Sequence, residues 1–202
     1  MTAPNPPRRR DALANREALL RAAQSVLASN PTASLDAIAQ AAGLTRRAVY
    51  GHFADRDTLL REVIAAGAQR FNAIAETTDE SDPRVTLARM ATRLWREASA
   101  VRASANIALD DAHLTDTVLA LAPLRHRIRD LTRTGVDSGA DMPAELLAFL
   151  IEETARATLR ELRLTTADAD STVVRVVLSI VGLSWREQAE LISAHPEIFA
   201  QD

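Results

Sequence analysis

The sequence predicts an all-α protein with two domains. Apolar residues recur at helical spacing along most of the chain, and no segment offers a partner for a β-strand. Hydrophobic residues make up 47% of the chain but aromatic residues only 3%, which favours packing of Ala, Leu and Val between helices. With 202 residues the chain is long enough to bury a core in each domain. We expect about nine helices: an N-terminal three-helix domain, a long connecting helix and a C-terminal helical bundle.

The N-terminal segment is expected to be an arm followed by a helix. Residues 1–11 are rich in Pro and Arg and contain no apolar run, so we expect a flexible arm and no signal peptide. The three arginines at 8–10 leave two interpretations open, a solvated tail or an arm that contacts nucleic acid. Residues 12–29 follow as the first helix, which Asn30 and Pro31 end.

Residues 34–53 predict two short helices joined by a tight turn. Ser34 is a candidate N-cap for the first, Gly43 permits the left-handed backbone that ends it, and Thr45 is a candidate N-cap for the second. Val49 and Phe53 are four residues apart and share the buried side of the second helix. An apolar stripe marks the first helix: Leu35, Ile38, Ala39 and Ala42.

The second of these helices carries polar side chains on its exposed side. Arg46, Arg47, Tyr50 and His52 point outward or sideways once Val49 faces the core. An ordinary helical corner with solvated arginines is one interpretation. Two adjacent arginines at a helix start, however, suit base edges and phosphates, since a guanidinium can hold guanine by two hydrogen bonds.

Residues 16–65 resemble the DNA-binding domain of TetR-family transcriptional regulators. The resemblance lies in three stretches, 34–45, 49–53 (Val-Tyr-Gly-His-Phe) and 54–60 (Ala-Asp-Arg-Asp-Thr-Leu-Leu), and covers about a quarter of the chain. It implies a repressor that binds double-stranded operator DNA as a homodimer and is released by a small-molecule inducer. In the family a basic residue, usually Lys, opens the fourth helix and contacts phosphate; here Arg56 stands there, in a chain without Lys.

DNA-contacting roles are assigned to seven residues. Arg46 and Arg47 are expected to read bases, whereas the others are expected to contact phosphate: Ser34, Thr45, Tyr50, His52 and Arg56. Charge supports this assignment, because residues 1–54 hold seven arginines and three acidic residues, whereas residues 55–202 hold 17 arginines and 24 acidic residues.

We expect three parts along the chain: an arm at 1–11, a DNA-binding domain at 12–55 and a regulatory and dimerisation domain at 56–202. The remaining helices belong to this last domain. Pro123 is expected either to kink a helix or to start a new one. Residues 173–181 have high strand propensity but are assigned to a helix, since no partner strand exists. The expected helices are 56–77 (the connecting helix), 84–101, 103–112, 115–137, 143–163 and 169–194.

The helices expected over 143–163 and 169–194 are apolar on nearly all sides. Two such helices from each subunit predict a four-helix dimer interface. A monomer with an unusually apolar core is the alternative. The residues expected at the interface are Leu146, Leu150, Val173, Val177, Ile180, Val181 and Trp185.

An inducer site is implied by the resemblance alone. The many Leu, Val and Ala side chains favour a largely apolar ligand. Each candidate also has a plain structural role, as a core or surface residue. The candidates are Trp95, Asn106, Asp110, His113, Phe149 and Glu153.

Two other classes of function are alternatives. A helical adaptor would dimerise without DNA selectivity, and a small helical enzyme would need a buried acid–base cluster such as Asp110, Asp111 and His113. The sequence contains neither a phosphate-binding glycine loop nor a nucleophile elbow. With no cysteine and no long apolar segment, we expect a cytoplasmic protein with no membrane partner, no metal and no cofactor.

Overall fold

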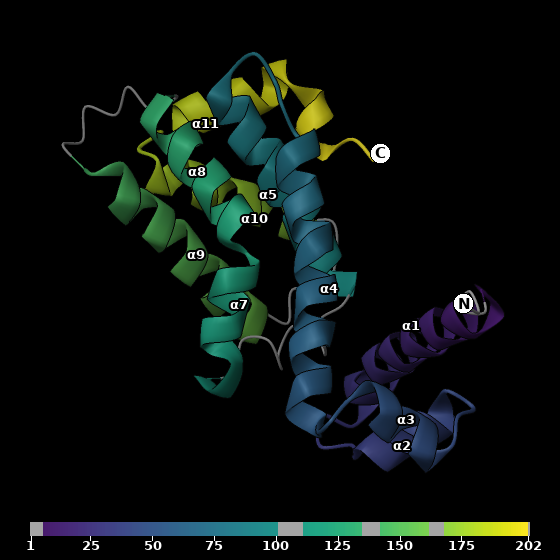
Figure 1. The fold of residues 1–202 in the computed structure, drawn as a ribbon. Helices are drawn as coiled ribbons and strands as arrows, with labels where there is room; N and C mark the ends of the chain where they lie inside the picture. The colour runs from purple at the N-terminus through teal and green to yellow at the C-terminus, as the bar shows by residue number, and fades with distance from the viewer. Residues whose placement is uncertain (1–5, 101–110, 135–141, 162–167, 202) are drawn as a thin grey trace. The chain divides into compact units, whose positions relative to one another are not determined.

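The computed structural model describes residues 6–100, 111–134, 142–161 and 168–201. These residues form ten α-helices, two short 3-10 helices and no strand (Figure 1). The all-α class is therefore confirmed, with a helix count close to the expected nine. Among these residues no helix is both long and apolar enough to cross a membrane. The chain divides into two compact units, and the boundary between them falls inside α4, after Gly67.

The first unit, in its described part, comprises residues 6–67 and 111–117. Its helices enclose a core centred on Phe53, which is fully buried. Buried side chains of the core come from four helices and include Leu19, Leu27, Ile38, Val49, Leu59 and Leu60. The helices are α1 (Pro6–Ser29), α2 (Leu35–Ala41), α3 (Arg46–His52) and the first part of α4 (Arg56–Thr77), with the 3-10 helix η1 (Asp111–His113) and most of α7 (Leu114–Ala120).

The first helix is longer than the sequence predicted. α1 begins at Pro6, so residues 6–11 are helical and do not belong to a flexible arm. Proline is well suited to the first turn of a helix, because its fixed φ matches the helix and its missing N–H has no partner there. The arginines and alanines that follow are good helix formers.

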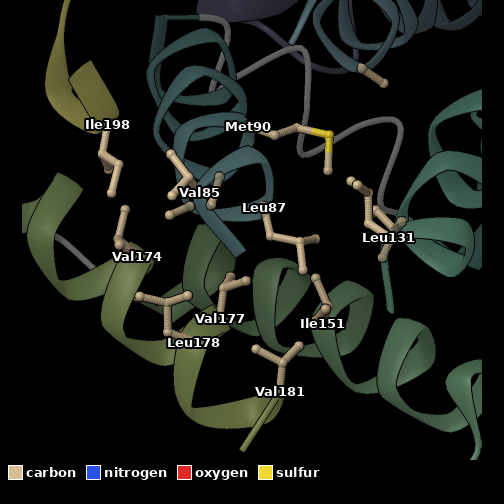
Figure 2. Packing of buried hydrophobic residues seen from close by; sticks show 14 of the residues in the cluster. Val85, Leu87, Met90, Leu131, Ile151, Val174, Val177, Leu178, Val181 and Ile198 are labelled. Atoms are coloured by element: carbon tan, nitrogen blue, oxygen red, sulfur yellow. The ribbon is translucent and has the colours of Figure 1, made fainter. Parts of the chain in front are cut away.

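The second unit, in its described part, comprises residues 68–100, 118–134, 142–161 and 168–201. Helix α5 packs along α10 and against α8, and buried aliphatic side chains fill the space between them (Figure 2). Val85 and Leu87 of α5 lie near Val174 and Leu178 of α10 in this core. The helices are α5 (Pro83–Ala100), α8 (Ala122–Thr134), α9 (Ala144–Glu161), α10 (Asp168–Ile180), α11 (Trp185–Ala194) and the 3-10 helix η2 (Pro196–Phe199).

Pro123 starts a new helix and does not kink a longer one. α7 ends at Ala120 and α8 begins at Ala122. Asn72 of α4 hydrogen-bonds on both sides of this break: its Nδ2 donates to the carbonyl of Ala120 at 3.0 Å, and its Oδ1 accepts from the N–H of Leu124 at 3.2 Å. The amide therefore satisfies the last turn of one helix and the first turn of the next. The helix expected over 103–112 lies outside the described residues except for its last two positions, which belong to η1.

The prediction of a single helix over 169–194 is wrong. The chain breaks at Gly182, whose φ of 91° is left-handed, and continues as α11. Ser184 starts α11 with a capping box: its Oγ accepts from the N–H of Glu187, while the Glu187 carboxylate accepts from the N–H of Ser184. The expected helix over 143–163 corresponds to α9.

Candidate nucleic-acid interface

The corner between α2 and α3 is built by local signals at each helix end. The Ser34 Oγ accepts from the N–H of Ala37 at 3.2 Å and caps α2. Gly43 has a φ of 69°, which lets the N–H of Leu44 reach back to the carbonyl of Ala39 at 2.9 Å. The Thr45 Oγ1 then accepts from the N–H of Ala48 and caps α3. The two helices expected from the sequence are confirmed.

Helix α3 has two distinct sides. Val49 and the following Phe53 are fully buried in the core of the first unit. Arg46, Arg47 and Tyr50 are exposed, and Tyr50 is 45% accessible although it is aromatic. The exposed side of this short helix therefore presents two cations and a phenol, the groups that hydrogen-bond to base edges and phosphate oxygens.

The two arginines of α3 differ in their surroundings. Nη1 of Arg46 pairs with Oδ2 of Asp36 at 3.0 Å, and its guanidinium carbon lies 5.4 Å from the centre of the Tyr50 ring. Arg47 is exposed and forms no ion pair with any described residue. The sequence does not predict this ion pair, because the spacing of Asp36 and Arg46 does not show that the turn brings the two side chains together.

Arg56, which the sequence leads us to expect at a phosphate, hydrogen-bonds to two backbone carbonyls. Its Nε donates to the carbonyl of Ala33 at 3.0 Å, and its Nη2 donates to the carbonyl of Pro31 at 2.5 Å. The guanidinium thus satisfies two carbonyls in the turn between α1 and α2. These contacts give Arg56 a structural role that follows from backbone geometry and not from any sequence motif.

The other expected phosphate contacts remain accessible in part. Ser34 and Thr45 are exposed; each hydroxyl accepts a backbone hydrogen bond and keeps its O–H for another acceptor. His52 is half-buried, with its ring tilted 52° against that of Phe53.

Asp55 fixes the turn from α3 into α4. Its Oδ1 accepts from the N–H of Thr58 at 2.7 Å. Hydrogen bonds from the side chain and the backbone of Thr58 hold the pKa of the Asp55 carboxyl below its usual value. Asp55 thereby caps α4.

The expected ligand-binding residues that the structure describes lie on different elements. Trp95 is buried in the second unit, whereas Phe149 is 51% exposed on α9 and Glu153 pairs with Arg156 at 3.5 Å. His113 belongs to η1 in the first unit. Asn106 and Asp110 lie outside the described residues.

The expected dimer residues divide into two groups. Val177 and Val181 are buried in the core of their own chain (Figure 2), so they are not available to a second copy. Leu150, Val173 and Ile180 are partly buried. Leu146 and Trp185 are exposed, at 43% and 69%. Packing within one chain thus accounts for the fully buried positions, and an interface at the others stays a prediction.

Comparison with known proteins agrees with this architecture. The sequence model of the bacterial regulatory proteins of the tetR family matches residues 19–63. No curated protein matches the chain.

Solved structures share the fold along nearly their whole length. A tetR-family regulatory protein from Rhodococcus RHA1 is 18% identical, with a TM-score of 0.70 over 84% of this chain and 98% of that one. The fatty acid degradation regulator FadR of Bacillus halodurans is 16% identical, with a TM-score of 0.69 over 92% and 99%. The regulator PfmR of Thermus thermophilus is 19% identical, with a TM-score of 0.67 over 82% and 98%. Residues 19–63 thus match the tetR family of bacterial regulatory proteins in sequence, and the chain shares the fold of solved TetR-family transcriptional regulators.

Proposed function

We propose that the protein is a homodimeric repressor that binds double-stranded operator DNA through α3. The observation that carries the proposal is the two-sided character of this helix: Val49 anchors it in the core, while Arg46, Arg47 and Tyr50 face outward. A helix held in this way can enter the major groove with its exposed side toward the bases. In a dimer, two such helices would meet the groove about one turn (~34 Å) or more apart, so the operator would be nearly palindromic.

Within this interface we assign base reading to the arginines and phosphate contacts to the hydroxyl groups. Replacing Arg46 or Arg47 with Ala should relax preference at particular base pairs, by about 1–3 kcal/mol for a lost bidentate contact. Tyr50→Phe should weaken binding to all sequences alike, roughly tenfold, because it removes one O–H bond to phosphate but keeps the ring. Equal losses on specific and random DNA for all three variants would contradict these roles.

We place the dimer interface on the exposed side of α9. Leu146 and Phe149 of α9 are 43% and 51% exposed in the single chain, and Met142, just before the helix, is 39% exposed. Leu150, the next residue on α9, is partly buried. Trp185, at the start of α11, is 69% exposed. Such a row of large apolar side chains is typical of a surface that another protein covers.

Regulation is assigned to the second unit. A largely apolar small molecule bound there would favour a dimer geometry with misplaced recognition helices, and it would release DNA by its higher affinity for that geometry. The proposal places the protein in the cytoplasm and assigns it no catalytic activity. A helical adaptor, the second candidate, would form dimers but select no DNA sequence.

The deciding experiment is selection of bound duplexes from a random DNA pool, followed by salt titration of the enriched sites. An enriched palindrome with a steep salt dependence, lost in the double variant Arg46→Ala/Arg47→Ala, would support the proposal. A folded dimer that enriches no sequence at low salt would favour the adaptor. A reporter gene placed behind the selected operator would then test repression, since expression should rise when the protein is absent.

A further inference from the structure

Asp36 contributes an acidic side chain to the surface that α3 presents. It lies in the first turn of α2, and its Oδ2 pairs with Nη1 of Arg46 at 3.0 Å. The other carboxylate oxygen, Oδ1, is buried and has no hydrogen-bond partner among the described residues. An acid at this place brings negative charge toward phosphate and so weakens attraction to DNA. Its presence there therefore calls for a different role.

The pairing restricts where the Arg46 guanidinium can point. The salt bridge holds one end of the group, and the face of Tyr50 lies 5.4 Å from its central carbon. Since 72% of the Arg46 side chain is exposed, this arrangement adds little to the stability of the fold. Its effect is on orientation: a guanidinium has five N–H donors, and pairing through Nη1 leaves Nε and Nη2 for a base edge.

We propose that Asp36 is a positioning residue that determines sequence specificity, by holding Arg46 in the orientation that reads a base and by keeping it from pairing with phosphate. This inference rests on the proposed function of α3 in DNA binding. Arg47, which has no ion pair among the described residues, is the contrasting case, because no salt bridge holds its guanidinium.

Removing the charge of Asp36 should therefore change specific and nonspecific binding in opposite directions. In Asp36→Asn, a mobile Arg46 should pair with phosphate more often, so affinity for random DNA should rise and its salt slope should steepen by about 0.9. Preference at the base pair read by Arg46 should fall about five- to tenfold. A residue that only supported the fold would lower both kinds of binding together.

The test uses the full chain in five versions: wild type, Asp36→Asn, Asp36→Ser, Asp36→Glu and Asp57→Asn. Asp57→Asn is the matched control, because it removes the same charge from an exposed site at the start of α4. Each version is used to select duplexes, and each is titrated with salt on the selected and on a scrambled duplex. Asp36→Ser is a second neutral variant should Asp36→Asn not fold, as judged by helical circular dichroism. Asp36→Glu keeps the carboxylate and should retain most of the preference.

The inference is supported if both neutral variants lose preference at one base pair of each half-site and bind scrambled DNA more tightly, while Asp57→Asn leaves base preference unchanged. In the Arg46→Ala background, Asp36→Asn should then alter no base preference. A wild type that selects a palindrome, with neutral Asp36 variants that keep every preference, overturns this inference alone. A wild type that selects no sequence overturns the proposed function and the inference with it.

Discussion

Arg56 ties the turn between α1 and α2 to the start of α4. Its guanidinium donates to the carbonyls of Pro31 and Ala33, two groups in a turn that no helix satisfies. Arg56→Ala should lower the free energy of unfolding by about 1–2 kcal/mol, since two charge-assisted hydrogen bonds are lost and the carbonyl of Ala33 loses a partly buried partner. Chemical denaturation of the full chain would measure this loss. Arg61→Ala, at an exposed site on the same helix, is the control and should change stability by less than about 0.5 kcal/mol.

The same variant distinguishes the structural role of Arg56 from a phosphate contact. If Arg56 served mainly to bind DNA, Arg56→Ala would keep the stability of the wild type and lose about one unit of the salt slope. That outcome would support the phosphate contact expected from the sequence.

Asp55 makes the stability of the protein depend on pH through its cap on α4. Hydrogen bonds from Thr58 lower the pKa of Asp55 in the folded state below its usual 3.8, so the unfolded chain takes up the proton first as pH falls. The contribution is therefore complete above about pH 4 and is lost as pH falls through the folded pKa. Asn also caps helices but does not titrate. Asp55→Asn should reduce the loss of stability between about pH 5 and about pH 3, measured by thermal unfolding.

Thr58→Ala offers an independent check, because it removes the largest cause of the lowered pKa of Asp55. It should also flatten the pH dependence in this range. A slope as steep as that of the wild type in both variants would show that other carboxyl groups control acid unfolding.

Two helical corners in this chain are built from nearly the same three residues. Gly43-Leu44-Thr45 joins α2 to α3, and Gly182-Leu183-Ser184 joins α10 to α11. In each, the glycine is left-handed and the leucine N–H reaches back to the helix, at 2.9 Å to Ala39 and 3.0 Å to Leu178. The first corner was predicted from its glycine and caps. The second was missed, although Ser184 and Glu187 form a recognisable capping-box pair, because the apolar run before Gly182 made one continuous helix look plausible.

Two glycines of the first unit differ in backbone conformation but not in the space around them. A Cβ added at Gly43 would meet nothing within 4 Å, so the cost of Gly43→Ala comes from its φ of 69° alone. We expect a loss of about 1–2 kcal/mol in the free energy of unfolding. Gly51 is helical and equally open, so Gly51→Ala should instead stabilise the chain, by up to about 1 kcal/mol. Opposite signs in urea denaturation would confirm the left-handed corner, whereas equal effects would contradict it.

Across the whole molecule, the sequence predicts the ends of helices well, but it does not predict which element or chain packs against each helix. The ends of α2 and α3 follow from Ser34, Gly43 and Thr45, whose effects are confined to neighbouring residues. Hydrophobic periodicity shows which side of a helix is buried but not what covers it. Val177 was therefore assigned to a dimer interface, although it packs within its own chain. Burial of Trp95, one of the ligand candidates, likewise depends on packing that no single helix encodes.

The exposed row on α9 gives the last prediction, which concerns assembly. Leu146 and Phe149 are 43% and 51% exposed in one chain and would be covered in the proposed dimer. The double variant Leu146→Glu/Phe149→Glu would place two like-charged pairs at a two-fold interface, where each residue meets the same surface of its partner. We expect it to be monomeric at micromolar concentration in sedimentation equilibrium, while the wild type is dimeric.

Leu119→Glu is the matched control, because Leu119 is 68% exposed but lies on α7. It should leave the dimer intact. The monomeric variant should also bind a palindromic duplex no more tightly than a single half-site, since the gain from two linked recognition helices is lost with the dimer. A double variant that still sediments as a dimer would show that the interface lies elsewhere than this side of α9. A wild type that sediments as a monomer would show that no second copy covers these side chains.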